Sequence, residues 1–153
     1  MTHELHLHID THELFADGAP FGEVGSYERI VGRAEVFLSP DSAHYQKVVD
    51  LVYATQDERG RVRYETDVYL LKPVDMPRGN RRLFFDVVNR GDKRALQFFN
   101  DAAASNEPVS HADAGNGYLM RLGYSILWCG WQADLLPGAG RSTIAVPIAR
   151  DGD

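Results

Sequence analysis

Cysteine, long hydrophobic runs and excess positive charge are all scarce in this sequence of 153 residues. The single cysteine, Cys129, excludes an internal disulfide framework. The longest stretch without a charged residue, 122–133, is shorter than the roughly 18 to 20 apolar residues that a membrane-spanning helix needs. The net charge of −6 should repel phosphate backbones and anionic lipids. The sequence therefore argues against nucleic-acid binding and against membrane binding.

The remaining composition is that of one ordinary globular domain. Hydrophobic residues make up 44% of the chain and charged residues 25%, and a chain of this length can bury a core without disulfides or metals. The first eight residues have neither the basic region nor the unbroken apolar core of a secretory signal. We therefore expect a single cytoplasmic domain over 1–153 that holds no cofactor.

The first half of the chain has the alternating pattern of strands with one apolar and one polar face. The alternation is clearest at 30–38 and 61–71. Residues 48–53 are a further candidate strand, and the turn at 57–60 would join it to 61–71 as an antiparallel hairpin. We therefore expect residues 1–80 to form an antiparallel, β-rich part.

The N-terminal segment alternates histidine with aliphatic residues. His6 and His8 would point the same way on a strand, and such a pair can ligate Zn²⁺. The simpler interpretation is a solvated strand in which Leu5, Leu7 and Ile9 face inward and the histidines face water. We therefore expect no metal, and a metal-dependent hydrolase is a distant alternative.

The second half of the chain changes to short, continuous apolar runs at 83–88 and 124–129. Such runs are typical of strands that are buried on both faces of a parallel sheet. We expect residues 81–134 to form a parallel strand-helix-strand unit. Residues 135–153 would then be a loop, the short strand 143–148 and the start of an insertion.

Two short helices are predicted between these runs. The first covers 93–100, and the second covers 117–123, with Asn116 as its N-cap and Gly123 as the left-handed residue at its end. The polar loop between them, 101–115, is longer than most ordered connections and is therefore expected to be functional or mobile.

The turns that follow the two apolar runs are the candidate site. Open α/β sheets bind ligands at the carboxyl ends of their parallel strands, and Gly91 would let backbone N–H groups approach a substrate oxygen. Trp131 would offer an apolar wall and Gln132 a hydrogen-bond partner. The candidate oxyanion or substrate-binding residues are Asn89, Arg90, Gly91, Trp131 and Gln132. The alternatives are an ordinary tight turn with a solvated Arg90, and a Trp131 that belongs to the core.

The chain has no G-x-S-x-G nucleophile elbow. Ser125 and Ser142 each follow a glycine by two residues but lack the second glycine. Cys129 could be a thiol nucleophile beside a histidine, although free cysteine is more often buried and inert. We therefore expect no catalytic residue within this chain.

A wider pattern links several segments in order: FGEVGSYE at 21–28, VGRA at 31–34, DVYLLKP at 67–73, VVNRG at 87–91, DAGNGYLMRLGY at 113–124 and WCGWQAD at 128–134. This series resembles the N-terminal region of the alpha/beta hydrolase domain proteins, and the resemblance spans nearly the whole chain.

The resemblance implies an α/β fold: the leading antiparallel strands plus the first parallel strand-helix-strand unit of an α/β-hydrolase sheet, truncated. Residues 89–91 would occupy the place of the H-G-G-G-type oxyanion loop. The serine, acid and histidine of such enzymes follow later in the chain, so His44 and His111 lie too early to serve as the triad histidine.

The implied function is the N-terminal segment of a serine-type hydrolase that cleaves a small ester or amide, inactive by itself. The alternative is a stand-alone, non-catalytic binding domain that uses the surface of Trp131 and Gln132. If the sheet is truncated, we expect residues 124–128 to form an open sheet edge, through which the chain would self-associate.

Overall fold

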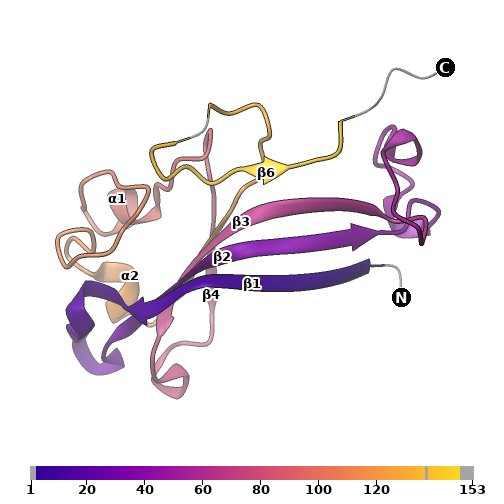
Figure 1. Cartoon of the computed structure of the whole chain (residues 1–153). Coiled ribbons are helices and arrows are strands. Elements are labelled where there is room, and N and C mark those ends of the chain that lie inside the picture. The colour runs from indigo at the N-terminus through magenta and orange to yellow at the C-terminus, as the bar shows by residue number, and fades with distance from the viewer. Residues whose placement is uncertain (1–2, 137, 149–153) are drawn as a thin grey trace.

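The computed structural model describes residues 3–136 and 138–148, and these form a mixed α/β fold around one sheet (Figure 1). Its strands are β1 (His3–Leu14), β2 (Tyr27–Leu38), β3 (Val62–Pro73), β4 (Leu83–Val87), β5 (Ser125–Cys129) and β6 (Ile144–Ala145). The helices are α1 (Ala95–Phe99) and α2 (Tyr118–Arg121), and five 3-10 turns lie at Phe15–Gly18, Gly22–Val24, Ala43–Tyr45, Leu51–Tyr53 and Met76–Arg78. No helix in the described part of the chain is long and apolar enough to cross a membrane.

The sheet is mostly antiparallel and contains one parallel pair. Its strand order is β1-β2-β3-β5-β4, and β6 adds a short pairing to β3. Only β4 and β5 run parallel, in the register that places Val87 beside Cys129. The predicted antiparallel first half and parallel second half are thus confirmed.

The position of β5 corrects the predicted sheet edge. We expected an open edge at 124–128, but β5 lies between β3 and β4 and is hydrogen-bonded on both sides. The strands at the two ends of the order are β1 and β4. The prediction was wrong because strand order depends on pairing between distant segments, which the local pattern does not contain.

The predicted strand at 48–53 is also wrong. Leu51–Tyr53 forms a 3-10 turn instead, and Asp50 before it takes a left-handed φ of 59°. The hairpin partner of β3 is β2, along the whole of both strands, with Tyr27 opposite Pro73 and Leu38 opposite Val62. Figure 1 shows the connecting turns at the end of the sheet that lies away from α1 and α2.

β1 pairs with β2 through a bulge between Ile9 and Thr11. Gly32 lies against this bulge, where a Cβ atom would come within 2.0 Å of the His8 carbonyl oxygen. A side chain at this position is therefore incompatible with the pairing of the two strands.

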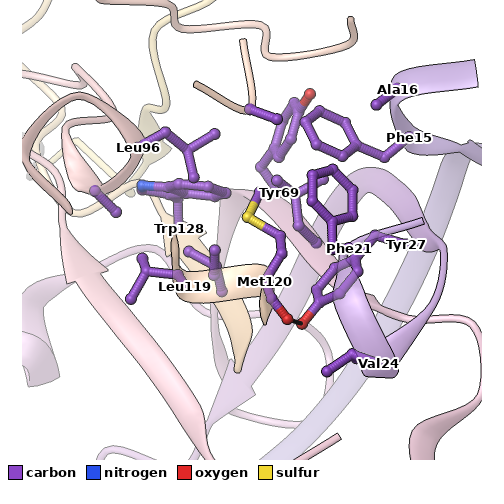
Figure 2. Close-up of a cluster of buried hydrophobic side chains, with 14 of the residues drawn as sticks. Phe15, Ala16, Phe21, Val24, Tyr27, Tyr69, Leu96, Leu119, Met120 and Trp128 are labelled. Carbon is purple, nitrogen blue, oxygen red and sulfur yellow. Dashed lines mark hydrogen bonds between the residues drawn. The ribbon is translucent and has the colours of Figure 1, made fainter. Parts of the chain in front are cut away.

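The core lies on one face of the sheet, which we call the covered face. Because side chains alternate along a strand, Tyr69 and Trp128 point to this face. The buried cluster joins covered-face residues of the strands to residues of α1, α2 and the turns after β1, including Phe15, Phe21, Tyr27, Leu96, Leu119 and Met120 (Figure 2). The Tyr27 hydroxyl lies 3.0 Å from the Met120 carbonyl oxygen and 2.9 Å from that of Tyr124. This contact ties β2 to the segment around α2.

The opposite face of the sheet, which we call the open face, is apolar and largely uncovered. Six of its side chains at the two outer strands leave between 51% and 61% of their surface exposed: Leu5, Leu7, Ile9, Leu83, Phe85 and Val87. Two predictions are corrected here. The leucines of β1 do not face a core, and β4 is not buried on both faces, because α1 and α2 both pack on the covered face.

The helices form where they were predicted but are shorter. α1 covers only part of 93–100; Leu96 is buried, whereas Phe99 stays 47% exposed. The N-cap of α2 is Gly117 and not Asn116 as predicted, because the helix begins one residue later, although Asn116 Oδ1 accepts a hydrogen bond from the Tyr118 N–H (2.9 Å). Gly123 takes the expected left-handed φ of 81°. The connection 101–115 contains no helix or strand, as expected.

Candidate functional site

The parallel pairing of β4 and β5 brings the two predicted turns to the same edge of the sheet. Val87 and Cys129 are register partners at the carboxyl ends of the strands. The chain then continues into the turn 89–92 on one side and the turn 130–134 on the other. Both predicted segments therefore meet at one place, which we call the strand-end site.

The first turn is tight and left-handed. Asn89 and Asp92 form an isolated bridge, and the two residues between them have positive φ angles, 51° at Arg90 and 82° at Gly91. Gly91 is enclosed by the chain itself, since a Cβ atom there would lie 2.8 Å from the Arg141 Cβ atom. Its carbonyl oxygen accepts a hydrogen bond from the Ser142 N–H (2.9 Å). The close approach that we predicted for a substrate is thus made by residues 141–142.

The two turns are held together by two hydrogen bonds. The Arg90 N–H donates to Gln132 Oε1 (2.7 Å), and Trp131 Nε1–H donates to the Val88 carbonyl oxygen (2.6 Å). Gln132 therefore occupies the Arg90 N–H, one of the backbone donors beside Gly91 that we expected to face a substrate oxygen. Trp131 leaves 55% of its surface exposed and so belongs to the surface rather than to the core.

A shallow pocket of about 250 Å³ adjoins the first turn. Its lining combines the cationic side chains of Arg90 and Arg141 and the carboxylate of Asp92 with two leucines, Leu135 and Leu136. The Arg90 side chain is 61% exposed, and its only ion-pair contact within the described residues is Asp134, 4.0 Å away. An apolar group and a developing negative charge could both be accommodated here.

Asp92 anchors the base of this pocket. Its carboxylate accepts a hydrogen bond from Asn106 Nδ2 (2.9 Å) and pairs with Arg94 Nη2 (2.8 Å) and Arg141 Nε (3.4 Å). The hydrogen bond from Asn106 and the two guanidinium groups lower the pKa of Asp92. The contact with Asn106 shows that the long loop 101–115 is attached to the site.

Lys93 is almost completely buried behind the turn. Its ammonium group donates to the carbonyl oxygens of Asn106 (2.7 Å) and Gly140 (2.9 Å) and lies 4.9 Å from the centre of the Tyr69 ring. Burial lowers the pKa of Lys93 to about 8. Lys93 therefore joins the two loops that flank the strand-end site.

Asp86, on β4, supports the site from below and was not singled out in the sequence. Its Oδ2 atom accepts hydrogen bonds from the Arg94 N–H (2.9 Å), the Ala95 N–H (2.8 Å) and Trp128 Nε1–H (2.6 Å). It thus caps α1 and satisfies the indole of a fully buried tryptophan. The sequence did contain a signal for this role, because Asp86 is the only charged residue within the apolar run 83–88, and a carboxylate in such a run needs hydrogen-bond partners when the strand is buried.

The structure assembles no nucleophilic centre from the candidate residues. Cys129 is half-buried on the open face, and burial raises the pKa of its thiol, which disfavours the reactive thiolate. Ser142 is buried, and its backbone N–H binds Gly91. The ring of His111 is stacked on that of Phe21, with the two ring centroids 6.4 Å apart.

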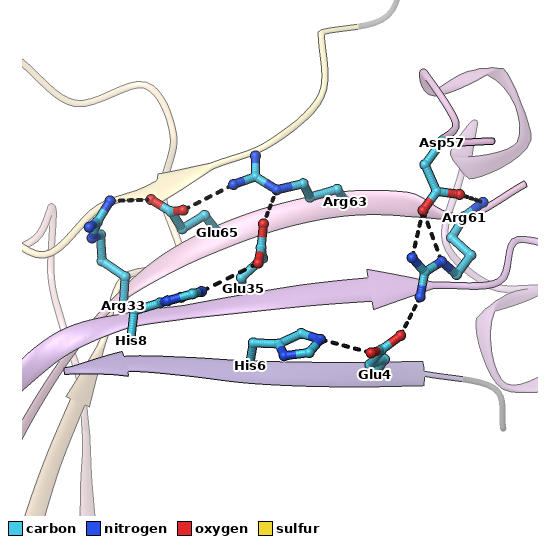
Figure 3. A network of polar contacts seen from close by, with 9 residues as sticks. All are labelled: Glu4, His6, His8, Arg33, Glu35, Asp57, Arg61, Arg63 and Glu65. Carbon is cyan, nitrogen blue, oxygen red and sulfur yellow. Dashed lines mark hydrogen bonds and ion pairs between the residues drawn. The ribbon is translucent and has the colours of Figure 1, made fainter. Parts of the chain in front are cut away.

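The histidines of β1 form separate pairs with carboxylates. His6 Nε2 lies 2.8 Å from Glu4 Oε1, and His8 Nε2 lies 3.4 Å from Glu35 Oε2 (Figure 3). Both carboxylates also bind arginines: Glu4 pairs with Arg61, and Glu35 pairs with Arg63. Within residues 3–136 and 138–148, no group of three His, Cys, Asp or Glu side chains is placed to hold a metal ion.

Comparison of the chain with protein-family models, with curated proteins and with solved structures found no match.

Proposed function

We propose that this chain is the leading part of a serine-type α/β-hydrolase, in which it supplies the sheet scaffold and a substrate-facing turn at 89–92. The nucleophile, acid and histidine would come from polypeptide outside these 153 residues. The observation that carries the proposal is the strand-end site itself. Two parallel strands end in turns that are joined to each other beside a cationic pocket, where α/β sheets bind ligands.

The sheet architecture also supports the proposal. Leading antiparallel strands followed by a parallel pair are the arrangement that the family resemblance implies. An antiparallel sheet that leaves one face to solvent ordinarily has polar residues on that face. Here α1 and α2 cover one face, and the open face has the apolar character of a surface that packs against further structure.

The chemistry would be stabilisation of the oxyanion of a small ester or amide substrate. The guanidinium groups of Arg90 and Arg141 flank the pocket in which a carbonyl oxygen would become negative. The Arg90 N–H would join them only if the Gln132 side chain rotates away from its present hydrogen bond. The position of the Gln132 side chain would then decide whether the Arg90 N–H is free to bind the substrate. The proposed reaction needs no cofactor.

A non-catalytic binding domain is the second candidate, and the exposure of Trp131 favours it. An exposed indole beside two arginines suits an aromatic or anionic partner. Against this reading, the side-chain oxygen of Gln132, the residue expected to bind the partner, is already hydrogen-bonded within the chain.

The intact mass of the product in its native source separates the two functions. A mass well above 17.1 kDa supports the hydrolase proposal, and the search for the triad then moves to the additional polypeptide. A mass of 17.1 kDa overturns it and favours the binding domain.

A further inference from the structure

The turns between β2 and β3 enclose an apolar groove that is separate from the strand-end site. The groove has a volume of about 410 Å³. The turns that line it lie at the end of the sheet away from α1 and α2 (Figure 1). Leu38 and Val62 come from the ends of the two strands, Ala54 comes from the turns, and Ile144 comes from β6. The volume is in the range of small-molecule sites.

The rim of the groove is exposed and aliphatic. Val49 leaves 82% of its surface exposed, Val48 50% and Val146 47%, whereas Val62 at the base is 2% exposed. Covering the rim with an apolar chain would remove this surface from water, which is favourable by the hydrophobic effect. The lining offers only the Tyr64 hydroxyl as a side-chain hydrogen-bonding group besides one carboxylate. The groove therefore suits a flexible aliphatic chain rather than a polar ligand.

The charge at the groove determines which head group such a ligand should have. Asp50 is the only charged side chain among the described residues that line it. Within the described part of the chain its carboxylate has no ion-pair partner, unlike Asp57 nearby, which pairs with Arg61 (2.8 Å). The whole chain carries a net charge of −6. A cationic head would thus be attracted and a carboxylate head repelled.

We propose that this groove is a binding site for a single-chain aliphatic molecule with a cationic head group, of the alkylammonium class. The aliphatic chain lies along Leu38, Val62 and Ile144, and the head lies at Asp50. Leu38, Val62 and Ile144 share the side of the sheet that carries Leu5, so the groove is the end of the open face beside the turns, and the proposal concerns that end alone. The Ile144 N–H does donate to the Gln132 carbonyl oxygen (3.3 Å), so the groove and the strand-end site share one segment of backbone.

The test is isothermal titration of the full chain with decyltrimethylammonium below its micelle concentration, compared with decanol and decanoate. We expect saturable binding of one molecule per chain, weaker binding of decanol and the weakest binding of decanoate. In Asp50→Asn, affinity for decyltrimethylammonium should fall about two- to fivefold and affinity for decanol should stay unchanged. Asparagine tolerates the left-handed φ of 59° at this position, so the turn is kept.

Two variants test the groove itself. Ala54→Trp fills it and should weaken binding of decyltrimethylammonium by at least about tenfold, the effect of losing contact with roughly two methylene groups. The double variant Val49→Ser and Val146→Ser changes only exposed rim residues, so it keeps the test valid if Ala54→Trp does not fold. Its expected loss is about fivefold.

The matched control is Phe85→Ser, which alters the open face on β4, away from the groove, and should change affinity less than about twofold. Equal losses in Phe85→Ser and the groove variants would overturn the proposal, because the amphiphile would then bind the open face in general. Undiminished binding in the groove variants would also overturn it. A dimer in light scattering that Ala54→Trp converts to a monomer, without amphiphile binding by the parent chain, would assign the groove to a second copy instead.

Discussion

Asp86 offers the sharpest test of how the strand-end site is held in place. Replacing it with alanine removes the acceptor of three hydrogen bonds at once. Loss of the cap on the Arg94 and Ala95 N–H groups of α1 should cost about 1 kcal/mol. The indole N–H of the fully buried Trp128 would lose its partner, at a cost of about 1 to 3 kcal/mol. The free energy of unfolding should therefore fall by about 2 to 4 kcal/mol.

The assay is urea denaturation followed by far-ultraviolet circular dichroism and by tryptophan fluorescence, with Asp86→Asn as the matched control. The asparagine oxygen can accept the same bonds without the negative charge, so this variant should lose about 1 kcal/mol or less. A loss below about 0.5 kcal/mol in Asp86→Ala would show that Asp86 does not hold α1 and Trp128 in place. Equal losses in the two variants would assign the effect to the charge rather than to the acceptor geometry.

Three further changes have defined outcomes. The pKa of Lys93 is about 8 in the folded chain and 10.5 in the unfolded chain, so the unfolded chain binds more protons between these two pH values. The free energy of unfolding of the parent chain, relative to that of Lys93→Met, should therefore rise from pH 8 to pH 10.5 by at most about 3 kcal/mol. Urea titrations that show no change of this difference over that pH range would contradict the burial of Lys93. Gly91→Ala should destabilise by about 2 to 3 kcal/mol in thermal unfolding, because φ is 82° and the new Cβ atom meets Arg141, whereas Gly138→Ala, with nothing within 4 Å of its Cβ position, tests the cost of a positive φ alone. Tyr27→Phe should cost about 1 to 2 kcal/mol by denaturant titration, since the Met120 and Tyr124 carbonyl oxygens lose their hydroxyl partner; an unchanged midpoint would show that water replaces it.

Local patterns in the sequence predicted most of the strands and turns. The alternation at 61–71 and the glycine of the turn before it identified β3, and Gly60 has the positive φ of 71° that such a turn requires. Residues 48–53 misled the prediction because a short apolar run fits a strand or a turn equally well. The left-handed conformation of Asp50 and the lack of a partner strand for these residues depend on how the whole chain packs, which a short sequence pattern does not contain.

The open face could not be predicted because it depends on which elements cover which side of the sheet. The runs at 83–88 and 124–129 have the composition of strands that are buried on both faces. In the structure, the fully buried Trp128 of β5 lies on the covered face. The missing information was that α1 and α2 pack on the same side. The sequence pattern of a strand gives its two faces but not their neighbours.

The strand-end site was located from the sequence, but its internal contacts were not. The turn residues of 89–92 and their position after an apolar run placed the first turn at the carboxyl end of β4. The hydrogen bond from the Arg90 N–H to Gln132 and the contact of Gly91 with residues 141–142 join segments about 40 to 50 positions apart.

The most direct test of the hydrolase proposal is labelling with a fluorophosphonate serine probe. We predict no specific labelling of the purified 153-residue chain, whose structure brings no histidine to a serine at the strand-end site within its described residues. We predict labelling of the product isolated from the native source with an antibody against this chain, at a serine outside these residues. Labelling of Ser125 or Ser142 in the purified chain, or a native product that the probe leaves unlabelled, would contradict the hydrolase proposal.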